Sequence, residues 1–248
     1  DITARTLNVE WRRGNDYASQ LTGKAVAGTL VADLNNESGD YATFNTSSPL
    51  SGNLLPGRKV KLTGNDGSTT RTLWTGFLDS IEPIPSATGA NKARLKAIGP
   101  LGYLNKFEVS TTMFASKKAG ELIGEILDVA GWPEDDRDLD TGIIEFRRFW
   151  CERTKTLKAL RLVEESETGL LEEDASGQIV YRDRHARSKD TRSTASQATY
   201  SDASGAALAY SHISQIDPLK FIYNQLTADI QLHSGAWILG CLLYTSDA

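Results

Sequence analysis

Short stretches of alternating apolar and polar residues, separated by turn residues, follow one another through residues 1–105. Each stretch has the two-residue period of a strand with one buried face. Pro56-Gly57 and Asn65-Asp66-Gly67 are turn sequences, and the second is typical of a hairpin. The predicted strands are Thr6–Trp11, Thr29–Leu34, Lys59–Thr63, Thr70–Ile81 and Asn91–Ile98. Strands at this spacing predict a β-barrel-like domain over residues 1–105.

The period changes to that of a helix in residues 106–184. Residues 119–131 place Leu122, Ile123, Ile126, Leu127 and Ala130 on one face, and Gly131 and Pro133 predict the end of that helix. A second helix is predicted over Leu157–Glu167, with Thr154 or Thr156 as its N-cap. A hairpin follows over residues 170–183. We therefore predict a small α+β domain of two helices and a hairpin over residues 106–184.

The glycines Gly120 and Gly124 lie four residues apart on the first predicted helix. Such a pair permits close packing of another segment, but glycines in a helix are more often simply tolerated.

Residues 185–206 are rich in Ser, Thr, Ala and charge and contain few large apolar residues, so they predict a polar linker or long loop. Strand character returns at Leu208–Ile213 and Phe221–Ile230. These stretches predict an incomplete second β-domain over residues 207–240. The expected fold class is thus mainly β with an α+β insertion.

The last eight residues, 241–248, resemble a translated sequencing adapter. The alternative is a short natural apolar strand. If the adapter interpretation is right, Asp247 does not count and the net charge of −5 becomes −5 + 1 = −4. Cys241 then also drops out, which leaves Cys151 and no internal disulfide. On this interpretation the chain is a metagenomic fragment, and the natural protein continues beyond Gly240.

Composition excludes some function classes. A net charge of −5 and a pI of about 5.3 argue against a dedicated nucleic-acid surface, which is usually basic. No run approaches the roughly 18 apolar residues of a membrane span, and the chain does not open as a signal peptide does. Two cysteines make no disulfide framework, so we expect a reducing compartment.

The acidic stretch from Asp135 to Asp140 invites a calcium interpretation, because Asp136, Asp138 and Asp140 have the spacing of an EF-hand start. The pattern then fails, because Thr141 replaces the turn glycine and Arg147 the bidentate glutamate. A solvated loop is therefore favoured. His185, His212 and His233 lack the spacing of zinc ligands, so neither a metal nor another cofactor is predicted.

Other candidate chemistry also favours structural interpretations. Cys151 is the one plausible thiol nucleophile, with Arg147, Arg148 and Arg153 nearby, but no local motif supplies a base, so a buried or half-buried cysteine is expected. Five glutamates are candidates for the paired carboxylates of glycoside hydrolysis, but their spacing fits a solvated face: Glu164, Glu165, Glu167, Glu172 and Glu173. No catalytic residue is therefore predicted.

Two further groups of residues are candidates for binding. The first is a basic patch, the best candidate for contact with DNA or an acidic neighbour, which consists of Arg182, Arg184, His185, Arg187 and Lys189. Because Asp183 and Asp190 interrupt its positive charge, a solvated edge is favoured. Four tryptophans are candidate interface anchors, although a core position is expected for each: Trp11, Trp74, Trp132 and Trp150.

A series of phrases spread over residues 1–230 resembles, in order and spacing, the tail hub, baseplate or minor tail proteins of long-tailed bacteriophages. The phrases include Gly28–Asn36, Asn53–Leu62, Leu73–Ile81, Leu95–Leu101, Ile126–Pro133 and Asp174–Arg182. The resemblance implies β-barrel-like domains separated by a small α+β insertion. It also implies a structural virion component that is assembled in the bacterial cytoplasm and has no catalytic residues.

The partners implied by the resemblance are other copies of the chain, in a ring that is commonly trimeric, and the tail tube, fibre or spike proteins. DNA would pass through the ring without sequence-specific binding. Two alternatives stay open: a carbohydrate-binding tail module that recognises the host, which exposed aromatics on one sheet face would support, and a fragment of a tail-associated cell-wall hydrolase.

Overall fold

The computed structural model describes residues 1–15, 24–42, 44–87, 89–186, 189, 191–196 and 198–201, together with four short strands between residues 225 and 244. The chain forms two compact units, Asp1–Ala195 and Ser196–Ala248. The finer division predicted from the sequence, with boundaries at residues 105, 184, 206 and 240, stays a prediction.

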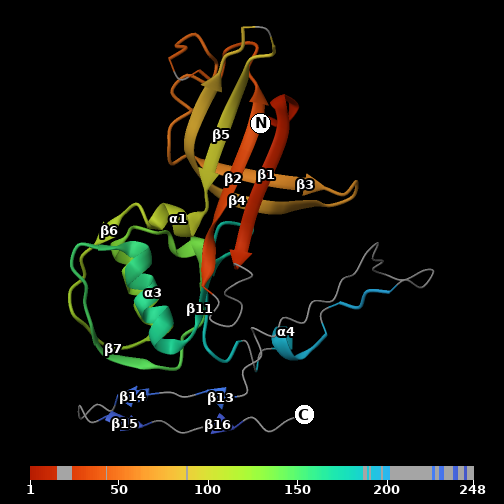
Figure 1. Ribbon diagram of the computed structural model, residues 1–248. Coiled ribbons are helices and arrows are strands. Elements are labelled where there is room, and N and C mark those ends of the chain that lie inside the picture. Colours follow the sequence, from red (N-terminus) through yellow and green to blue (C-terminus); the bar gives the residue numbers. More distant parts are fainter. Residues whose placement is uncertain are drawn as a thin grey trace. The chain divides into compact units, whose positions relative to one another are not determined.

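The N-terminal part of the first unit is a curled five-stranded sheet that forms half of a barrel (Figure 1). A 3-10 turn at Thr3–Arg5 precedes it. Its spatial order is β1-β2-β5-β4-β3 and every neighbouring pair is antiparallel. The strands are β1 (Thr6–Asn15), β2 (Ala25–Asn35), β3 (Lys59–Asn65), β4 (Thr70–Ile84) and β5 (Lys92–Ile98). The five predicted strands and the mainly β fold class are confirmed.

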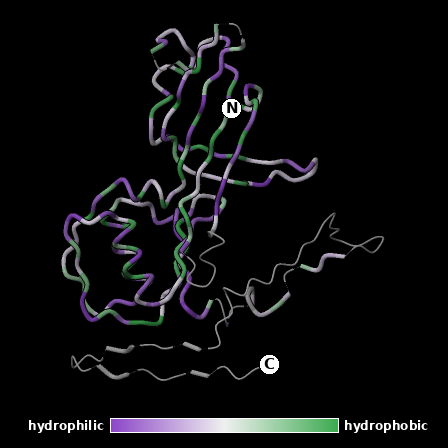
Figure 2. Tube along the Cα trace, viewed as in Figure 1, coloured by the Kyte–Doolittle hydropathy of each residue, from purple (hydrophilic) through white to green (hydrophobic). Residues whose placement is uncertain are grey.

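One face of this sheet carries the core. Residues alternate along β2 and β5, so that Leu30, Ala32, Leu34, Ala93 and Leu95 are buried while their neighbours are more exposed. Figure 2 shows apolar and polar residues mixed along the strands of this sheet. The connection between β2 and β3 packs on this same face through its apolar residues, which are Tyr41, Leu50 and Leu54. Burying a side chain the size of leucine contributes about 1.5–3 kcal/mol, so this connection stabilises the sheet.

The predicted hairpin turn between β3 and β4 is confirmed. The Asp66 carboxylate accepts hydrogen bonds from the backbone N–H groups of Ser68 and Thr69, at 3.0 and 2.7 Å. Gly67 has a φ of 96°, a conformation that glycine adopts without steric cost. The hairpin reaches beyond the other strands of the sheet (Figure 1).

The α+β part of the first unit follows the sheet. Its helices are α1 (Pro100–Leu104), α2 (Ala119–Val129) and α3 (Thr156–Glu167), with a 3-10 turn at Glu134–Asp136. Strands β11 (Leu170–Glu173) and β12 (Ile179–Arg182) form the predicted hairpin, and β8 (Arg137–Leu139) runs parallel to β12. Two small ribbons pair β7 (Phe114–Lys118) with β9 (Glu145–Phe149), and β6 (Glu108–Val109) with β10 (Thr154–Lys155).

Helix α2 matches its prediction. Leu122, Ile123, Ile126 and Leu127 are fully buried in a core that also contains Ala159, Leu160 and Val163 of α3. Gly131 has a φ of 70°, and the N–H groups of Gly131 and Trp132 close the helix end on the carbonyls of Asp128 and Leu127.

The two glycines of α2 differ. A Cβ atom on Gly120 would lie 1.7 Å from the carbonyl oxygen of Asp140, whereas one on Gly124 would find its nearest neighbour 3.8 Å away. Close packing is therefore real at Gly120, and Gly124 is merely tolerated.

The predicted threonine cap of α3 is wrong. Lys155 occupies the N-cap position and no side chain caps the helix. The Thr156 hydroxyl donates to the carbonyl of Phe107 at 3.2 Å, and the Thr154 hydroxyl donates to the carbonyl of Glu152 at 3.0 Å. Both hydroxyls are thus engaged by carbonyls of preceding segments.

The rest of the described chain contains α4 (Thr191–Thr194) and four short strands. Helix α4 falls within the predicted linker. In the second unit, β13 (Gln225–Leu226) pairs with β16 (Leu243–Tyr244), and β14 (Asp229–Gln231) pairs with β15 (Trp237–Leu239). The strand predicted at residues 208–213 lies outside the described residues.

Candidate functional site

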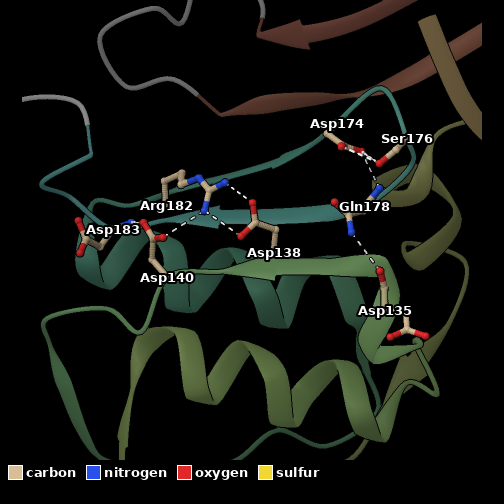
Figure 3. A network of polar contacts seen from close by, with 8 residues as sticks. All are labelled: Asp135, Asp138, Asp140, Asp174, Ser176, Gln178, Arg182 and Asp183. Atoms are coloured by element: carbon tan, nitrogen blue, oxygen red, sulfur yellow. Dashed lines mark hydrogen bonds and ion pairs between the residues drawn. The ribbon is translucent and has the colours of Figure 1, made fainter. Parts of the chain in front are cut away.

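The acidic stretch from Asp135 to Asp140 contacts Arg182, which belongs to the basic patch considered in the sequence. Because β8 and β12 run parallel, with Tyr181 paired to Leu139, their C-terminal ends lie side by side. Arg182 at the end of β12 makes ion pairs with Asp138 and, at 3.1 Å, with Asp140 (Figure 3). The hydrogen bond that Arg182 donates to Asp138 raises the pKa of Arg182, so the guanidinium stays charged.

These ion pairs occupy the carboxylates that the calcium interpretation needs. Asp136 accepts a hydrogen bond from Lys59 at 2.8 Å, and the second oxygen of Asp140 accepts the backbone N–H of Asp183 at 3.1 Å. No grouping of metal-ligating side chains occurs in the described part of the chain. The expected solvated loop is also wrong in part, since residues 137–139 form a strand.

The turn between β11 and β12 is braced in a similar way. Asp174 accepts hydrogen bonds from the Ser176 hydroxyl and from the Gln178 N–H, the latter at 2.8 Å. The Gln178 side chain donates to the carbonyl of Asp135 at 3.0 Å, which ties the turn to the 3-10 segment (Figure 3). The whole network therefore holds two parallel strands together at both ends.

The basic patch does not form a uniform positive surface. Arg182 is half-buried between aspartates, and Arg187 lies outside the described residues. A depression of about 650 Å³ beside this strand end has a mixed lining that includes Asp140, Asp183, His185 and Lys189. The carboxylates offset the cations, so this edge lacks the excess positive charge of a DNA-binding surface.

Cys151 is buried, as predicted. Its N–H donates to the Thr111 hydroxyl at 3.0 Å, and its sulfur lies 4.0 Å from the carbonyl oxygen of Val109. The partners of the thiol are thus neutral groups of the neighbouring segment. His212 and His233 lie outside the described residues.

The glutamates overturn a sequence prediction. Instead of facing solvent, Glu164, Glu167 and Glu173 are buried, with exposures of 3%, 0% and 4%. The predicted solvated face holds for Glu165, which is half exposed and pairs with Lys24. Glu172 is half-buried.

Each buried carboxylate holds backbone N–H groups. Glu164 accepts from Leu171 at 2.8 Å and from the guanidinium of Arg161 at 2.6 Å. Glu167 accepts from Ile143 at 2.8 Å and from Ile144 at 3.3 Å. Both oxygens of these carboxylates are occupied by the protein, an arrangement that suits loop anchoring rather than acid–base catalysis.

Glu173 joins three elements. From the end of β11 its two oxygens accept the N–H groups of Gly28 on β2, at 2.7 Å, and of Leu101 on α1, at 2.9 Å. Burial raises the pKa of Glu173, and these hydrogen bonds act in the opposite direction. A Cβ atom on Gly28 or Gly99 would lie 2.1 or 2.0 Å from a Glu173 oxygen, so both glycines are needed for the carboxylate to fit.

Two of the four tryptophans are not in the core. Trp74 and Trp132 are buried, as predicted, but Trp11 is 46% exposed and Trp150 is 64% exposed. Trp11 lies on β1, which forms one edge of the sheet, and Trp150 follows directly after β9. Alternation along a strand locates a face, but it does not reveal that the strand is at an edge.

No family model matches the sequence, and no curated protein matches it. The solved structures that are similar to it include two tail proteins and a component of a secretion system. One is the 43 kDa tail protein of prophage MuSo2 from Shewanella oneidensis, with 14% identity, a TM-score of 0.42, and coverage of 64% of this chain and 47% of that chain. Another is a tail protein from Neisseria meningitidis MC58, with 12% identity, a TM-score of 0.45, and coverage of 70% and 49%.

A third is an E. coli component of the type VI secretion system, described as structurally similar to tail proteins gp27 and gp5 of bacteriophage T4. It has 9% identity and a TM-score of 0.47, with coverage of 72% of this chain and 46% of that chain. The chain thus spans about half the length of these proteins. All three TM-scores lie below 0.5. None of the described helices is both long enough and apolar enough to cross a membrane.

Proposed function

We propose that this chain is a non-enzymatic structural part of a phage tail tip, a hub or baseplate protein that joins the tail tube to a fibre or spike. The ordered phrases of the sequence, such as Gly28–Asn36 and Leu73–Ile81, support this assignment by their resemblance to that class. They fall on the half-barrel, where they build β2 and β4.

The observation that carries the proposal is the open edge of the sheet. Among the described residues, β1 has β2 as its single strand partner, so one side of this ten-residue strand is left without a neighbouring strand. Its apolar residues Leu7 and Trp11 are 55% and 46% exposed. Long exposed apolar edges favour association with another chain, which a subunit of an assembly needs.

The polar groups support a structural role. The candidate calcium ligands bind Lys59 and Arg182, and the buried glutamates bind backbone N–H groups or an arginine. Side chains that catalyse a reaction must instead face a bound substrate. The chemistry-bearing residues therefore favour a tail part over a hydrolase.

In the proposed assembly, copies of the chain close a ring, commonly of three subunits, around a channel that DNA leaves through. The net charge of −5 fits this role, because an acidic protein does not retain DNA electrostatically. The ring belongs to the virion tail and is built in the bacterial cytoplasm.

The test is self-assembly and binding to tail-tube protein, measured by sedimentation velocity with the full chain over a wide range of concentrations. We expect concentration-dependent oligomers and co-sedimentation with tail-tube protein. A chain that stays monomeric at high concentration and never associates with tail-tube protein would refute the proposal, and lysis zones from the purified protein would favour the hydrolase alternative.

A further inference from the structure

The ribbon formed by β7 and β9 carries positive charge in an otherwise acidic chain. We call residues 113–118 and 145–153 the basic ribbon. They contain Lys117, Lys118, Arg147, Arg148 and Arg153 against Glu145 and Glu152, so their net charge is 5 − 2 = +3, whereas the whole chain has −5. Lys117 is paired with Glu125 at 2.6 Å, but Arg148 and Arg153 are exposed.

An exposed apolar pair lies at one end of this ribbon. Phe114 and Phe149 are register partners and both pack against the core of the α+β part. The same register places Met113 and Trp150 at the next pair of positions, where their side chains are 57% and 64% exposed. An exposed tryptophan beside arginines has the composition of a protein–protein contact.

The backbone of the ribbon is strained in a way that presents the arginines. Phe146 and Phe149 both contact the core although they are three residues apart, so strand alternation is interrupted and the intervening Arg147 and Arg148 are both exposed. Ser116, on the opposing strand, has a φ of 53°, and Arg153 has a φ of 44°. Left-handed non-glycine residues of this kind are uncommon in proteins and are frequent at functional sites.

The chain also carries a surface of opposite charge. We call residues 134–138 the acidic run. Glu134 and Asp135 are exposed, and their carboxylates have no side-chain partner among the described residues. Strand β7 leads directly into the N-terminal end of α2, whereas Glu134 and Asp135 follow its C-terminal end in the chain. The helix has 11 residues and is therefore about 16 Å long.

We propose that the basic ribbon of one copy of this chain binds the acidic run of a second copy. The inference rests on the proposed self-assembling role and names the surfaces that meet. A contact between two different patches is heterologous, and repeated contacts of this kind close a ring when the rotation between subunits allows it. Trp150 and Met113 would supply the apolar centre of the contact, and Arg148 and Arg153 its charged rim.

A protein partner is favoured over a nucleic acid. The exposed carboxylates of Glu145 and Glu152 interrupt the positive charge of the ribbon, whereas a nucleic-acid surface clusters its lysines and arginines on one face. The ribbon also presents a methionine with its tryptophan, and methionine is typical of protein interfaces.

The experiment is a charge reversal tested in trans. One variant carries Arg148→Glu and Arg153→Glu, and the other carries Glu134→Lys and Asp135→Lys. Each variant alone brings like charges together, so we expect its self-association to weaken by roughly tenfold or more in sedimentation velocity at low salt. In an equimolar mixture the ribbon of each variant meets a run of opposite charge on the other variant, so the two variants should associate with each other. In a ring of three subunits, two of the three contacts are then between opposite charges.

The matched controls are Lys92→Glu and Glu37→Lys, which reverse exposed charges outside both patches and should leave association unchanged. Circular dichroism checks that every variant is folded. Trp150→Ala should weaken association at both low and high salt, because its contribution is apolar.

The outcomes separate this inference from the proposed function. If the natural sequence assembles and both reversal variants assemble equally well, the surfaces are wrong while the tail role stands. If the natural sequence never self-associates, both fail. A mixture that does not recover overturns the acidic run as the partner. A DNA oligonucleotide that binds the natural sequence but not the ribbon variant would assign the ribbon to nucleic acid instead.

Discussion

Glu173 is the residue whose removal tests most directly how the first unit is held together. Its carboxylate is 4% exposed and accepts hydrogen bonds from the N–H groups of Gly28 and Leu101. The substitution Glu173→Ala leaves both N–H groups buried without an acceptor. A buried donor that loses its partner costs about 1–3 kcal/mol, so the two together cost roughly 2–6 kcal/mol.

Part of this loss is offset, because the carboxylate itself is costly to bury. We therefore expect Glu173→Ala to lower the free energy of unfolding of the first unit by about 3 kcal/mol. For a unit of this size, 1 kcal/mol shifts the melting temperature by about 2–4 °C, so the expected shift is about 6–12 °C.

The measurement is urea or thermal unfolding followed by circular dichroism, with Glu172→Ala as the control on the neighbouring position. Glu172 is half-buried, and a change there should stay within about 0.5 kcal/mol. Equal effects of the two substitutions would refute the view that the Glu173 hydrogen bonds hold the junction.

The pH dependence of the same residue has a defined sign. Burial raises the pKa of Glu173 above its ordinary value of 4.5, so the folded protein holds this proton more tightly than the unfolded chain does. Protonation of Glu173 therefore stabilises the folded protein. This stabilisation is complete below pH 4.5 and is lost as the pH rises through the raised pKa of Glu173. Relative to Glu173→Gln, which does not titrate, the natural sequence should gain stability as the pH falls through this window; a loss would contradict the sign.

Three further predictions concern packing, ion pairing and reactivity. Gly120→Ala should destabilise the protein by about 1–3 kcal/mol, because its Cβ would clash with the carbonyl of Asp140. Gly124→Ala should be neutral or stabilising by up to about 1 kcal/mol. Chemical denaturation measures the unfolding free energy of both variants. Arg182→Gln, which removes two partly exposed ion pairs, should cost about 1 kcal/mol at low salt and less at high salt in the same assay. In a Cys241→Ser variant, Cys151 should react with a thiol reagent at least about tenfold more slowly in native protein than in denaturant. Equal rates would contradict its burial.

Local signals predicted the parts of the fold that depend on local chemistry. Helix α2 has an apolar face with the helical period and a glycine at its end, and both features are present in the structure. The hairpin at Asn65-Asp66-Gly67 follows from turn chemistry that needs no distant partner. The short strands β6, β7, β9 and β10 were missed because each is two to five residues long and lacks a periodic signal.

The positions of charged residues were less predictable, because they depend on contacts between distant segments. Glu173 is 145 residues from its partner Gly28, and no local pattern distinguishes it from the half-buried Glu172. In the sequence, the aspartates Asp138 and Asp140 and the arginine Arg182 belong to two separate candidate sites. The parallel pairing of β8 with β12 brings them together. The one feature of the sequence that relates to the burial of Glu173 is the pair of glycines Gly28 and Gly99, which leave space for its carboxylate.

The buried carboxylate of Glu173 also suits a protein that forms part of an assembly, because it fixes the sheet relative to the α+β part. Apolar contacts between the sheet and the α+β part would tolerate some sliding, because the hydrophobic effect is not directional. The hydrogen bonds of Glu173 are directional, and they fix β11 against one position of β2 and one of α1. A subunit that meets its neighbours through both the edge of β1 and the basic ribbon needs these two surfaces at a constant spacing. Glu173→Ala should therefore weaken the proposed assembly even under conditions in which most of the protein is folded.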